Sequence, residues 1–108
     1  MITLTVLYGH PQDTSAFDRH YQQTHIPLVH KLPGLKGFVI QKPQALNPQE
    51  TFPYYLIANL YWENMQAFQD ALQSSAGQAA TADVQTFATG GATLLVGEQQ
   101  VIVPVSLG

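Results

Sequence analysis

Four histidines are the residues best suited to chemistry in this 108-residue chain: His10, His20, His25 and His30. Imidazole can exchange a proton at neutral pH, and it is also a common metal ligand. A shared metal site is disfavoured, because the last three lie five residues apart, or about 140° around an α-helix. No carboxylate stands at useful spacing among them. The sequence therefore predicts a single acid/base histidine and no metal site.

His25 is the strongest candidate for that acid/base group, because Pro27 follows two residues later. Proline lacks an amide hydrogen, and its ring crowds the carbonyl four residues earlier, which here is that of Gln23. We expect the helix to kink or break near His25 and Ile26, and the imidazole to point into a cavity there. The competing interpretation is that His25 caps the broken helix or forms a hydrogen bond in the core. Spacing alone favours this second interpretation.

Tyrosine and tryptophan are numerous for this length and could line an apolar pocket with a few hydroxyl groups. They are Tyr8, Tyr21, Tyr54, Tyr55, Tyr61 and Trp62. Most of them are expected in the core or in a dimer interface, where Tyr and Trp are enriched. Asn59 is an amide among apolar neighbours and needs a partner, which could be a water, another subunit or a ligand. The predicted ligand-binding residues are Tyr8, Tyr21, Asn59 and Tyr61.

Several classes of function have no motif in the chain. There is no glycine-rich phosphate loop, no dinucleotide fingerprint and no nucleophile motif. The sequence therefore predicts no cofactor. Cysteine is absent, so no disulfide or thiolate chemistry is expected.

The charge of the chain is mild, with a net value of −3, and only 10% of its residues are charged. All four basic residues fall in one stretch: Arg19, Lys31, Lys36 and Lys42. They give either a local positive field that favours an anionic ligand or a solvated face. The whole chain lacks the basic footprint of a nucleic-acid-binding protein. No basic leader or long apolar run is present, so we expect no membrane partner and a cytoplasmic location.

The first half of the chain predicts two strands around one helix. Residues 2–9 alternate apolar and β-branched residues with period two, as in a strand ended by Gly9-His10-Pro11. Asp13, Thr14 or Ser15 is expected to cap a helix with Phe17, Tyr21, Thr24, Leu28 and Leu32 on one face. Pro33-Gly34 stops this helix, and residues 35–42 predict a second strand followed by a loop.

The second half predicts two more strands. Residues 54–62 form the strongest strand pattern, with Tyr55, Ile57, Asn59 and Tyr61 on one face and apolar residues on the other. A helix follows from Glu63, a break spans 74–78, and residues 79–88 are expected to be helical in pieces, with Asp83 as a possible cap. Residues 92–98 predict the fourth strand, and 101–105 a short extra edge strand limited by Pro104.

The predicted order is β-α-β-β-α-β, the ferredoxin-like arrangement of a single α+β domain over residues 1–108. Two helices can cover only one face of a four-stranded antiparallel sheet, yet residues 54–62 are largely apolar on both faces. A second copy related by two-fold symmetry is the simplest cover for the other face. The low charge also suits an interface. The sequence therefore predicts a homodimer that forms an α+β barrel.

Three segments of the chain resemble the EthD family, named for ether-degradation gene clusters. They are His20-Tyr21 with His25-Ile26-Pro27-Leu28, Leu32-Pro33-Gly34-Leu35, and Asp83-Val84 with Phe87-Ala88. Their order and spacing run from the first helix nearly to the fourth strand. The resemblance implies a dimeric α+β barrel, and it matches the family histidine to His25 and the family aromatic residue to Tyr21. Asp83 matches a late aspartate, for which we expect a structural role.

The resemblance also implies an oxidoreductase label, and relatives on the same fold include cofactor-free cyclases, isomerases and small monooxygenases. We expect a small, largely apolar ligand between sheet and helices, with His25 as the acid/base group of an oxidoreductase, isomerase or cyclase. The alternative is a non-catalytic binding or accessory protein of the same pathway. A haem-associated relative with an axial histidine has little support in the residues.

Overall fold

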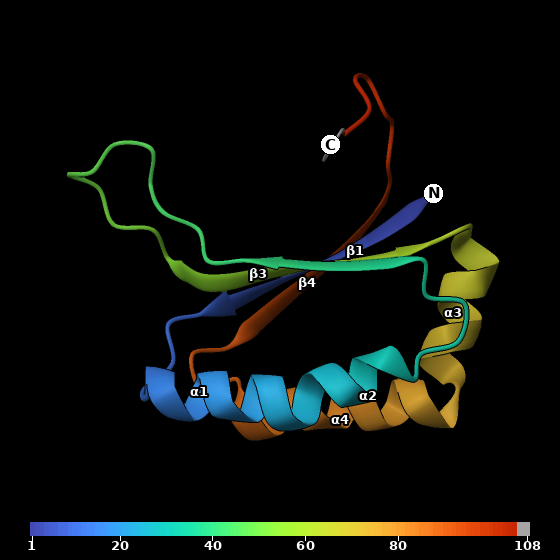
Figure 1. Ribbon diagram of the computed structural model, residues 1–108, viewed down its shortest axis with the longest axis horizontal. Coiled ribbons are helices and arrows are strands. Elements are labelled where there is room, and N and C mark those ends of the chain that lie inside the picture. Colours follow the sequence, from blue (N-terminus) through green and yellow to red (C-terminus); the bar gives the residue numbers. More distant parts are fainter. Residues whose placement is uncertain (106–108) are drawn as a thin grey trace.

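The computed structural model describes residues 1–105 and contains one sheet and a layer of helices (Figure 1). A turn of π-helix, labelled η1, joins the first two α-helices end to end. Along the chain the elements are β1 (Ile2–Gly9), α1 (Thr14–His20), η1 (Tyr21–His25), α2 (Ile26–His30), β2 (Gly37–Gln41), β3 (Tyr54–Trp62), α3 (Met65–Gln73), α4 (Ser75–Phe87) and β4 (Ala92–Glu98).

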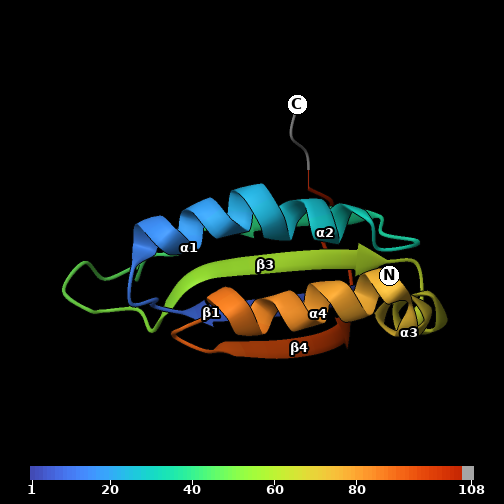
Figure 2. The same cartoon turned by 90° about the horizontal axis from the view of Figure 1, so that it is seen from below.

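The sheet has the strand order β2-β3-β1-β4, and every neighbouring pair is antiparallel. The register places Val6 of β1 opposite Ala58 of β3, and Thr5 opposite Leu95 of β4. On the face below the sheet in Figure 1, the α1–α2 helix and α4 lie side by side (Figure 2). The predicted ferredoxin-like α+β fold is confirmed.

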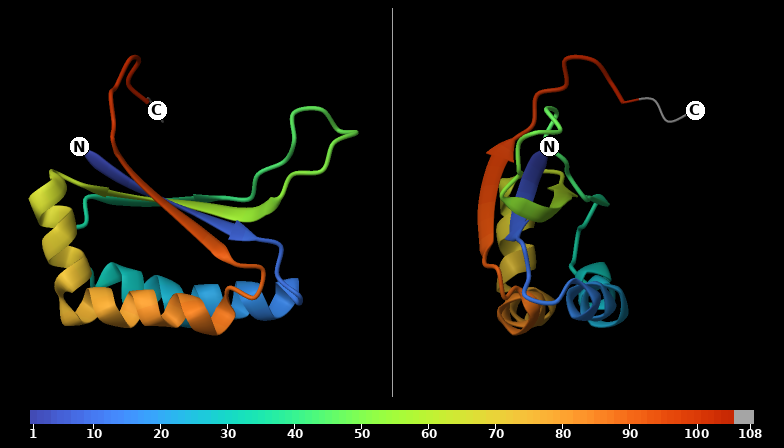
Figure 3. Two further views of the ribbon diagram at one scale, coloured as in Figure 1. Left: turned by 180° about the vertical axis from the view of Figure 1, so that it is seen from behind. Right: turned by 90° about the vertical axis from the view of Figure 1, so that its left-hand side faces the viewer.

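Helices cover only one of the two faces of the sheet, and successive side chains along each strand point alternately to the covered and the uncovered face. Residues of β1 and β3 that point toward the helices are buried in strict alternation, from Ile2 to Tyr8 and from Leu56 to Trp62. Their neighbours in sequence point to the opposite face, which no helix covers (Figure 3). We call this surface the open face; its central strands contribute Thr3, Thr5, Leu7, Ile57, Asn59 and Tyr61.

Trp62 fixes the entry of the chain into β2. Its side chain is fully buried, and its indole Nε1 donates a hydrogen bond to the carbonyl of Pro33 at 3.0 Å. Gly34 adopts a positive φ of 71° beside the indole, a conformation that favours glycine. The Leu-Pro-Gly turn is thus held against the end of β3.

The first helix is disturbed near His25 and Ile26, as predicted, but it does not end there: α1 passes into the π-turn, and α2 begins at Ile26 with Pro27 in its first turn. The backbone stays helical through Tyr21, His25 and Ile26, and the N–H of Ile26 bonds to the carbonyl of Tyr21, five residues earlier. A proline ring clashes with the carbonyl four residues before it. The wider π-turn moves that carbonyl aside, so the helix passes the proline with one extra residue in its turn.

This extra residue shifts the buried face of the helix. The expected stripe continued through Thr24 and Leu28, but Thr24 is exposed and Leu28 only half-buried. The buried residues are instead Phe17, Tyr21, His25, Val29 and Leu32. The π-turn therefore brings His25 into the interior.

Three further predictions about elements need correction. The predicted break over 74–78 is confined to Ser74, whose hydroxyl caps α4, and α4 then runs from Ser75 as one continuous helix and not in separate pieces. Asp83 lies inside α4 and caps nothing. Residues 101–105 form no strand. No strand of the sheet pairs with these residues, and their apolar side chains are exposed.

No helix within residues 1–105 has both the length and the apolar character needed to cross a membrane.

Candidate functional site

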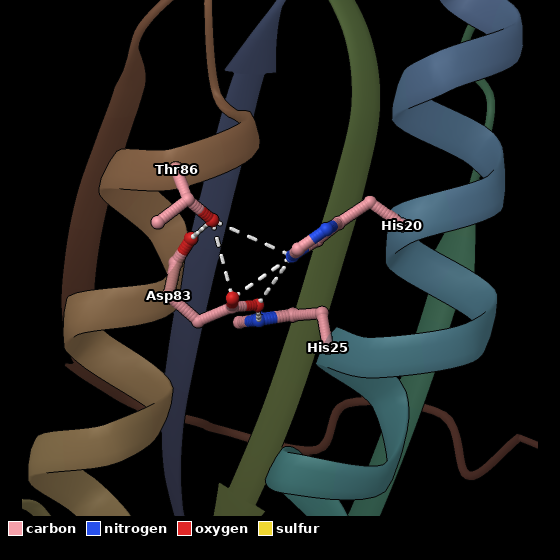
Figure 4. Close-up of polar contacts among 4 residues, drawn as sticks. All are labelled: His20, His25, Asp83 and Thr86. Atoms are coloured by element: carbon pink, nitrogen blue, oxygen red, sulfur yellow. Dashed lines mark hydrogen bonds and ion pairs between the residues drawn. The ribbon is translucent and has the colours of Figure 1, made fainter.

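The candidate site is centred on the carboxylate of Asp83 in α4, which faces two histidines of the neighbouring helix (Figure 4). His25 Nδ1 lies 2.9 Å from Oδ2 of Asp83. His20 Nε2 lies 2.8 Å from Oδ1 and 3.0 Å from Oδ2. The hydroxyl of Thr86 donates to the carbonyl of Asp83 at 2.7 Å and also lies 3.2 Å from Oδ1. One carboxylate therefore joins the two histidines.

The π-turn explains how His20 and His25 come together. In a regular α-helix, residues five apart point in directions about 140° from each other. The hydrogen bonds of a π-turn instead join residues five apart, so the two side chains lie on the same side of the helix. The expectation that these histidines do not converge is wrong, because it assumed a uniform α-helix.

Charge and burial define the protonation states in this cluster. Burial alone would raise the pKa of Asp83, but hydrogen bonds from His20 and His25 hold it below its usual value of 3.8, so Asp83 is ionised. An ionised carboxylate only accepts, so His25 donates through Nδ1–H. Burial lowers the pKa of His25 despite the opposing effect of Asp83. At neutral pH His25 is therefore a neutral imidazole whose Nε2 carries the lone pair.

A cavity of about 100 Å³ lies between the sheet and the helices, and His25 lines it. Its walls come mostly from apolar side chains of all four strands and of the helices. Ala58 and Ala80 help to leave this space open, because both are small residues in a buried wall otherwise built from Leu, Val and aromatic side chains. Exposed residues at one side, among them Thr81, Gln85 and Leu94, form a rim between α4 and the edge strand β4.

Tyr8 and Tyr21 lie in the same cavity wall as His25, as predicted from sequence. Their rings are 5.8 Å apart, and the ring of Tyr21 lies 5.3 Å from that of His25. Burial raises the pKa of both phenols well above the ordinary value. Both hydroxyls therefore stay protonated and can donate hydrogen bonds.

Asn59 and Tyr61 do not join this cavity. Both lie on the open face, since they alternate with the buried residues Ala58, Leu60 and Trp62. The partner that Asn59 was expected to need is Thr5, whose hydroxyl donates to Asn59 Oδ1 at 2.7 Å. A single site between sheet and helices thus contains three of the five predicted residues.

The basic residues and the outer histidines lie elsewhere. None of Arg19, Lys31, Lys36 and Lys42 lines the cavity, and Lys42 pairs with Asp18 at 3.1 Å. His10 bonds to the carbonyl of Phe52 at 2.7 Å, and His30 is exposed. Across residues 1–105, no three side chains of His, Cys, Asp or Glu are arranged to hold a metal ion.

Asp83 was missed as a site residue, although the resemblance to EthD proteins singled it out. A structural cap was the simplest role for an aspartate near a predicted helix start. Its real neighbours, His20 and His25, lie 63 and 58 positions away in sequence. Only the packing of α4 against the α1–α2 helix brings them together.

The buried His25 makes the stability of the protein depend on pH. The unfolded chain protonates this histidine near 6.5, whereas the folded protein does so at lower pH. Between these values the unfolded state binds the extra proton, so the free energy of unfolding falls as the pH decreases below about 6.5. We expect denaturant titrations between pH 7 and 5 to show a shallower fall in His25→Gln. The exposed-histidine variant His30→Gln should keep the wild-type slope, and an equal slope in all three proteins would contradict the prediction.

Comparisons with known proteins agree with this fold. The EthD domain matches residues 9–91, which include the whole His20–His25–Asp83 cluster. An uncharacterised 11.0 kDa protein from the thcB-thcC intergenic region of Rhodococcus erythropolis is 40% identical over 106 residues, covering 96% of this chain and 100% of that protein. A crystal structure of an ethyl tert-butyl ether degradation (EthD) family protein from Bacillus halodurans is 34% identical, with a TM-score of 0.86, and the match covers 93% of this chain and 99% of the other.

More distant structures share the fold alone. A dimeric ferredoxin-like protein of unknown function from Thermobifida fusca is 13% identical with a TM-score of 0.68, covering 91% of this chain and 90% of that one. SnoaB from Streptomyces nogalater, described as a cofactor-independent oxygenase, is 14% identical with a TM-score of 0.58, covering 94% and 96%. The domain match and the two closer relatives, together with the fold, show that this chain belongs to the EthD family.

Proposed function

We propose that the protein is an enzyme in which His25 acts as a general base on a small, largely apolar molecule bound in the cavity. The observation that carries this proposal is the hydrogen bond of 2.9 Å between His25 Nδ1 and the ionised Asp83. It fixes the tautomer and the orientation of the imidazole and leaves Nε2 as the free base. A base oriented by a carboxylate beside an apolar cavity is suited to proton abstraction.

The chemistry begins with the transfer of a proton from the ligand to Nε2 of His25. Asp83 stabilises the imidazolium that forms, because its negative charge lies at the other ring nitrogen. The hydroxyls of Tyr8 and Tyr21 supply protonated donors for the negative charge left on the ligand. Return of the proton to another ligand atom completes an isomerisation or cyclisation. Reaction of the ligand anion with dioxygen would instead give a cofactor-free oxygenation.

The cavity also limits the class of ligand. Among residues 1–105, no lysine or arginine lines it, and the titratable residues that do are Tyr8, Tyr21 and His25. A carboxylate or phosphate would lose its hydration there without gaining a cationic partner. We therefore propose a neutral ligand with a weakly acidic hydrogen, such as a phenol, an enol or a ketone. The cofactor-independent oxygenase that shares this fold supports oxygenation as one candidate reaction.

A generic probe can test the base without knowledge of the natural substrate. In 5-nitrobenzisoxazole, a base removes the ring C–H proton, the C–H electron pair forms a nitrile, and the N–O bond breaks to give a coloured phenolate. We expect the protein to accelerate this reaction, and His25→Gln to lower the rate by about a hundredfold or more, as loss of a general base does. His30→Gln, which changes an exposed histidine of the same helix, should keep the wild-type rate.

A second control separates the cavity from the base. Ala58→Leu fills buried space in the cavity wall and leaves the imidazole and Asp83 in the sequence, so it should abolish turnover in a protein whose folding circular dichroism confirms. Wild-type protein that does not accelerate the reaction, or His25→Gln with the full rate, would overturn the proposal. The non-catalytic alternative would then be favoured, in which the cavity binds its ligand for another protein of a pathway and the His25–Asp83 pair is structural.

We also propose that a second copy of the chain covers the open face and completes an α+β barrel. Apolar side chains from all four strands lie on that face: Leu7, Val39, Ile57, Tyr61 and Leu95. Val39 and Leu95 are more than half exposed. The face carries no charged side chain at these positions, as in the core of an interface. The dimeric description of the Thermobifida protein supports the same assembly.

Two segments outside the sheet favour this arrangement. The loop after β2 and the chain after β4 both rise on the side of the open face (Figures 1 and 3). Both carry apolar side chains that are largely exposed: Leu46, Val101, Ile102, Val103 and Val105. A partner on the open face would bury them. The oxidoreductase label, the absence of a cofactor and the cytoplasmic location stay predictions.

A further inference from the structure

We propose that His20 is a positioning residue for His25 and acts through the carboxylate that the two histidines share. The inference rests on the proposed role of His25, and it assigns a function to a histidine that does not line the cavity. His20 Nε2 lies within 3.0 Å of both oxygens of Asp83, whereas His25 Nδ1 bonds to Oδ2 alone. Since an ionised carboxylate only accepts, both ring nitrogens donate to it. His20 thereby fixes the orientation of the carboxylate, so that Oδ2 stays directed at Nδ1 of His25.

Burial increases from one end of this cluster to the other. The exposed fraction of the side chain is 31% for His20, 11% for Asp83 and 5% for His25. His20 also lines a separate depression of about 240 Å³ on the outer surface, together with Asp13 and Thr86. The cluster therefore runs from a solvent-accessible histidine to the histidine of the inner cavity. Protons from solvent reach His20 first.

The charge on His20 decides how much of the negative charge of Asp83 is available to His25. When His20 is neutral, the carboxylate can stabilise a proton arriving at His25. When His20 is protonated, it neutralises the carboxylate, and its own positive charge opposes protonation of His25. The ring of Tyr21 lies 5.3 Å from that of His25, and Tyr8 lines the same cavity; both are protonated phenols and carry no charge.

Phe87 contacts the rings of both histidines and so helps to fix their positions beside Asp83. The ring of His20 stacks on Phe87 with centroids 5.1 Å apart and an angle of 28°, and the ring of His25 lies 4.8 Å from the same phenyl group. His20 therefore has one apolar contact and one polar contact. Two substitutions can separate them.

His20→Gln keeps an N–H donor at the end of the side chain but cannot carry a charge. His20→Phe keeps a ring against Phe87 but has no donor. In the nitrobenzisoxazole reaction at neutral pH, we expect His20→Gln to stay near the wild-type rate. We expect His20→Phe to lose about tenfold, as happens when an outer partner that orients a ligand is removed.

Nitrogen-detected NMR of histidine-labelled protein tests the inference even if no reaction is found. We expect His25 to keep its Nδ1–H tautomer in His20→Gln and to titrate at higher pH in both variants than in the wild type, because a neighbouring positive charge is lost. His30→Gln should leave the titration of His25 unchanged. Identical titration of His25 in the wild type and both His20 variants would overturn the inference. That result leaves the test of His25 as a base intact, since the latter depends on His25→Gln.

Discussion

Asp83→Asn is expected to abolish general-base activity while the cavity still binds its ligand. An asparagine amide has one accepting oxygen and a donating nitrogen, so it cannot offer an acceptor at both of the positions that Oδ1 and Oδ2 of Asp83 occupy. If the amide nitrogen faces His25, that imidazole adopts the opposite tautomer and its Nε2 carries a hydrogen. The charge that stabilises the imidazolium is lost in either orientation. We expect the rate with nitrobenzisoxazole to fall by about a hundredfold to ten-thousandfold.

Two measurements separate this effect from unfolding. The tautomer of His25 can be read from its ring nitrogen shifts in the wild type and in Asp83→Asn. Asp70→Asn provides the matched control, since Asp70 is an exposed carboxylate on α3 that bonds only to the side chain of Gln66. The control should match the wild type in rate, tautomer and unfolding temperature. A folded Asp83→Asn protein with the full rate would rule out the proposed role of the carboxylate.

Ile57→Lys is expected to convert a dimer into a folded monomer. Ile57 lies on the open face of the central strand β3, so a two-fold interface would bury two copies of the new charge. Burying an unpaired charge costs several kcal/mol, and about 1.4 kcal/mol corresponds to a tenfold change in affinity. The dissociation constant should therefore rise by about a hundredfold or more.

Light scattering at micromolar concentration measures this change directly. Gln78→Lys is the matched control, because Gln78 is exposed on α4, on the opposite side of the sheet. We expect a dimer for the wild type and the control, and a monomer with an intact circular dichroism spectrum for Ile57→Lys. A monomeric wild type, or a dimeric Ile57→Lys protein, would show that the open face is not the interface.

The sequence by itself determined the frame that carries the site. Period-two patterns in residues 2–9 and 54–62 defined two strands and, for residues 2–9, the buried face, because alternation is a local property of an extended chain. The cap at Asp13, an interruption near Ser74 and the turn at Pro33-Gly34 were also readable, since each depends on a few adjacent residues. His25 and Tyr21 were identified from spacing and from the resemblance to EthD proteins.

Only the tertiary structure decided how the cluster of His20, His25 and Asp83 is assembled. A helix that meets a proline can end, kink or widen, and the sequence around Pro27 does not distinguish these outcomes. The widened turn rotates His25 inward and aligns it with His20. Asp83 reaches them only because α4 packs beside that helix, a contact across nearly sixty positions. Local patterns fix which face of a strand is buried, but the partners of a buried polar group come from segments that meet only after the chain has folded.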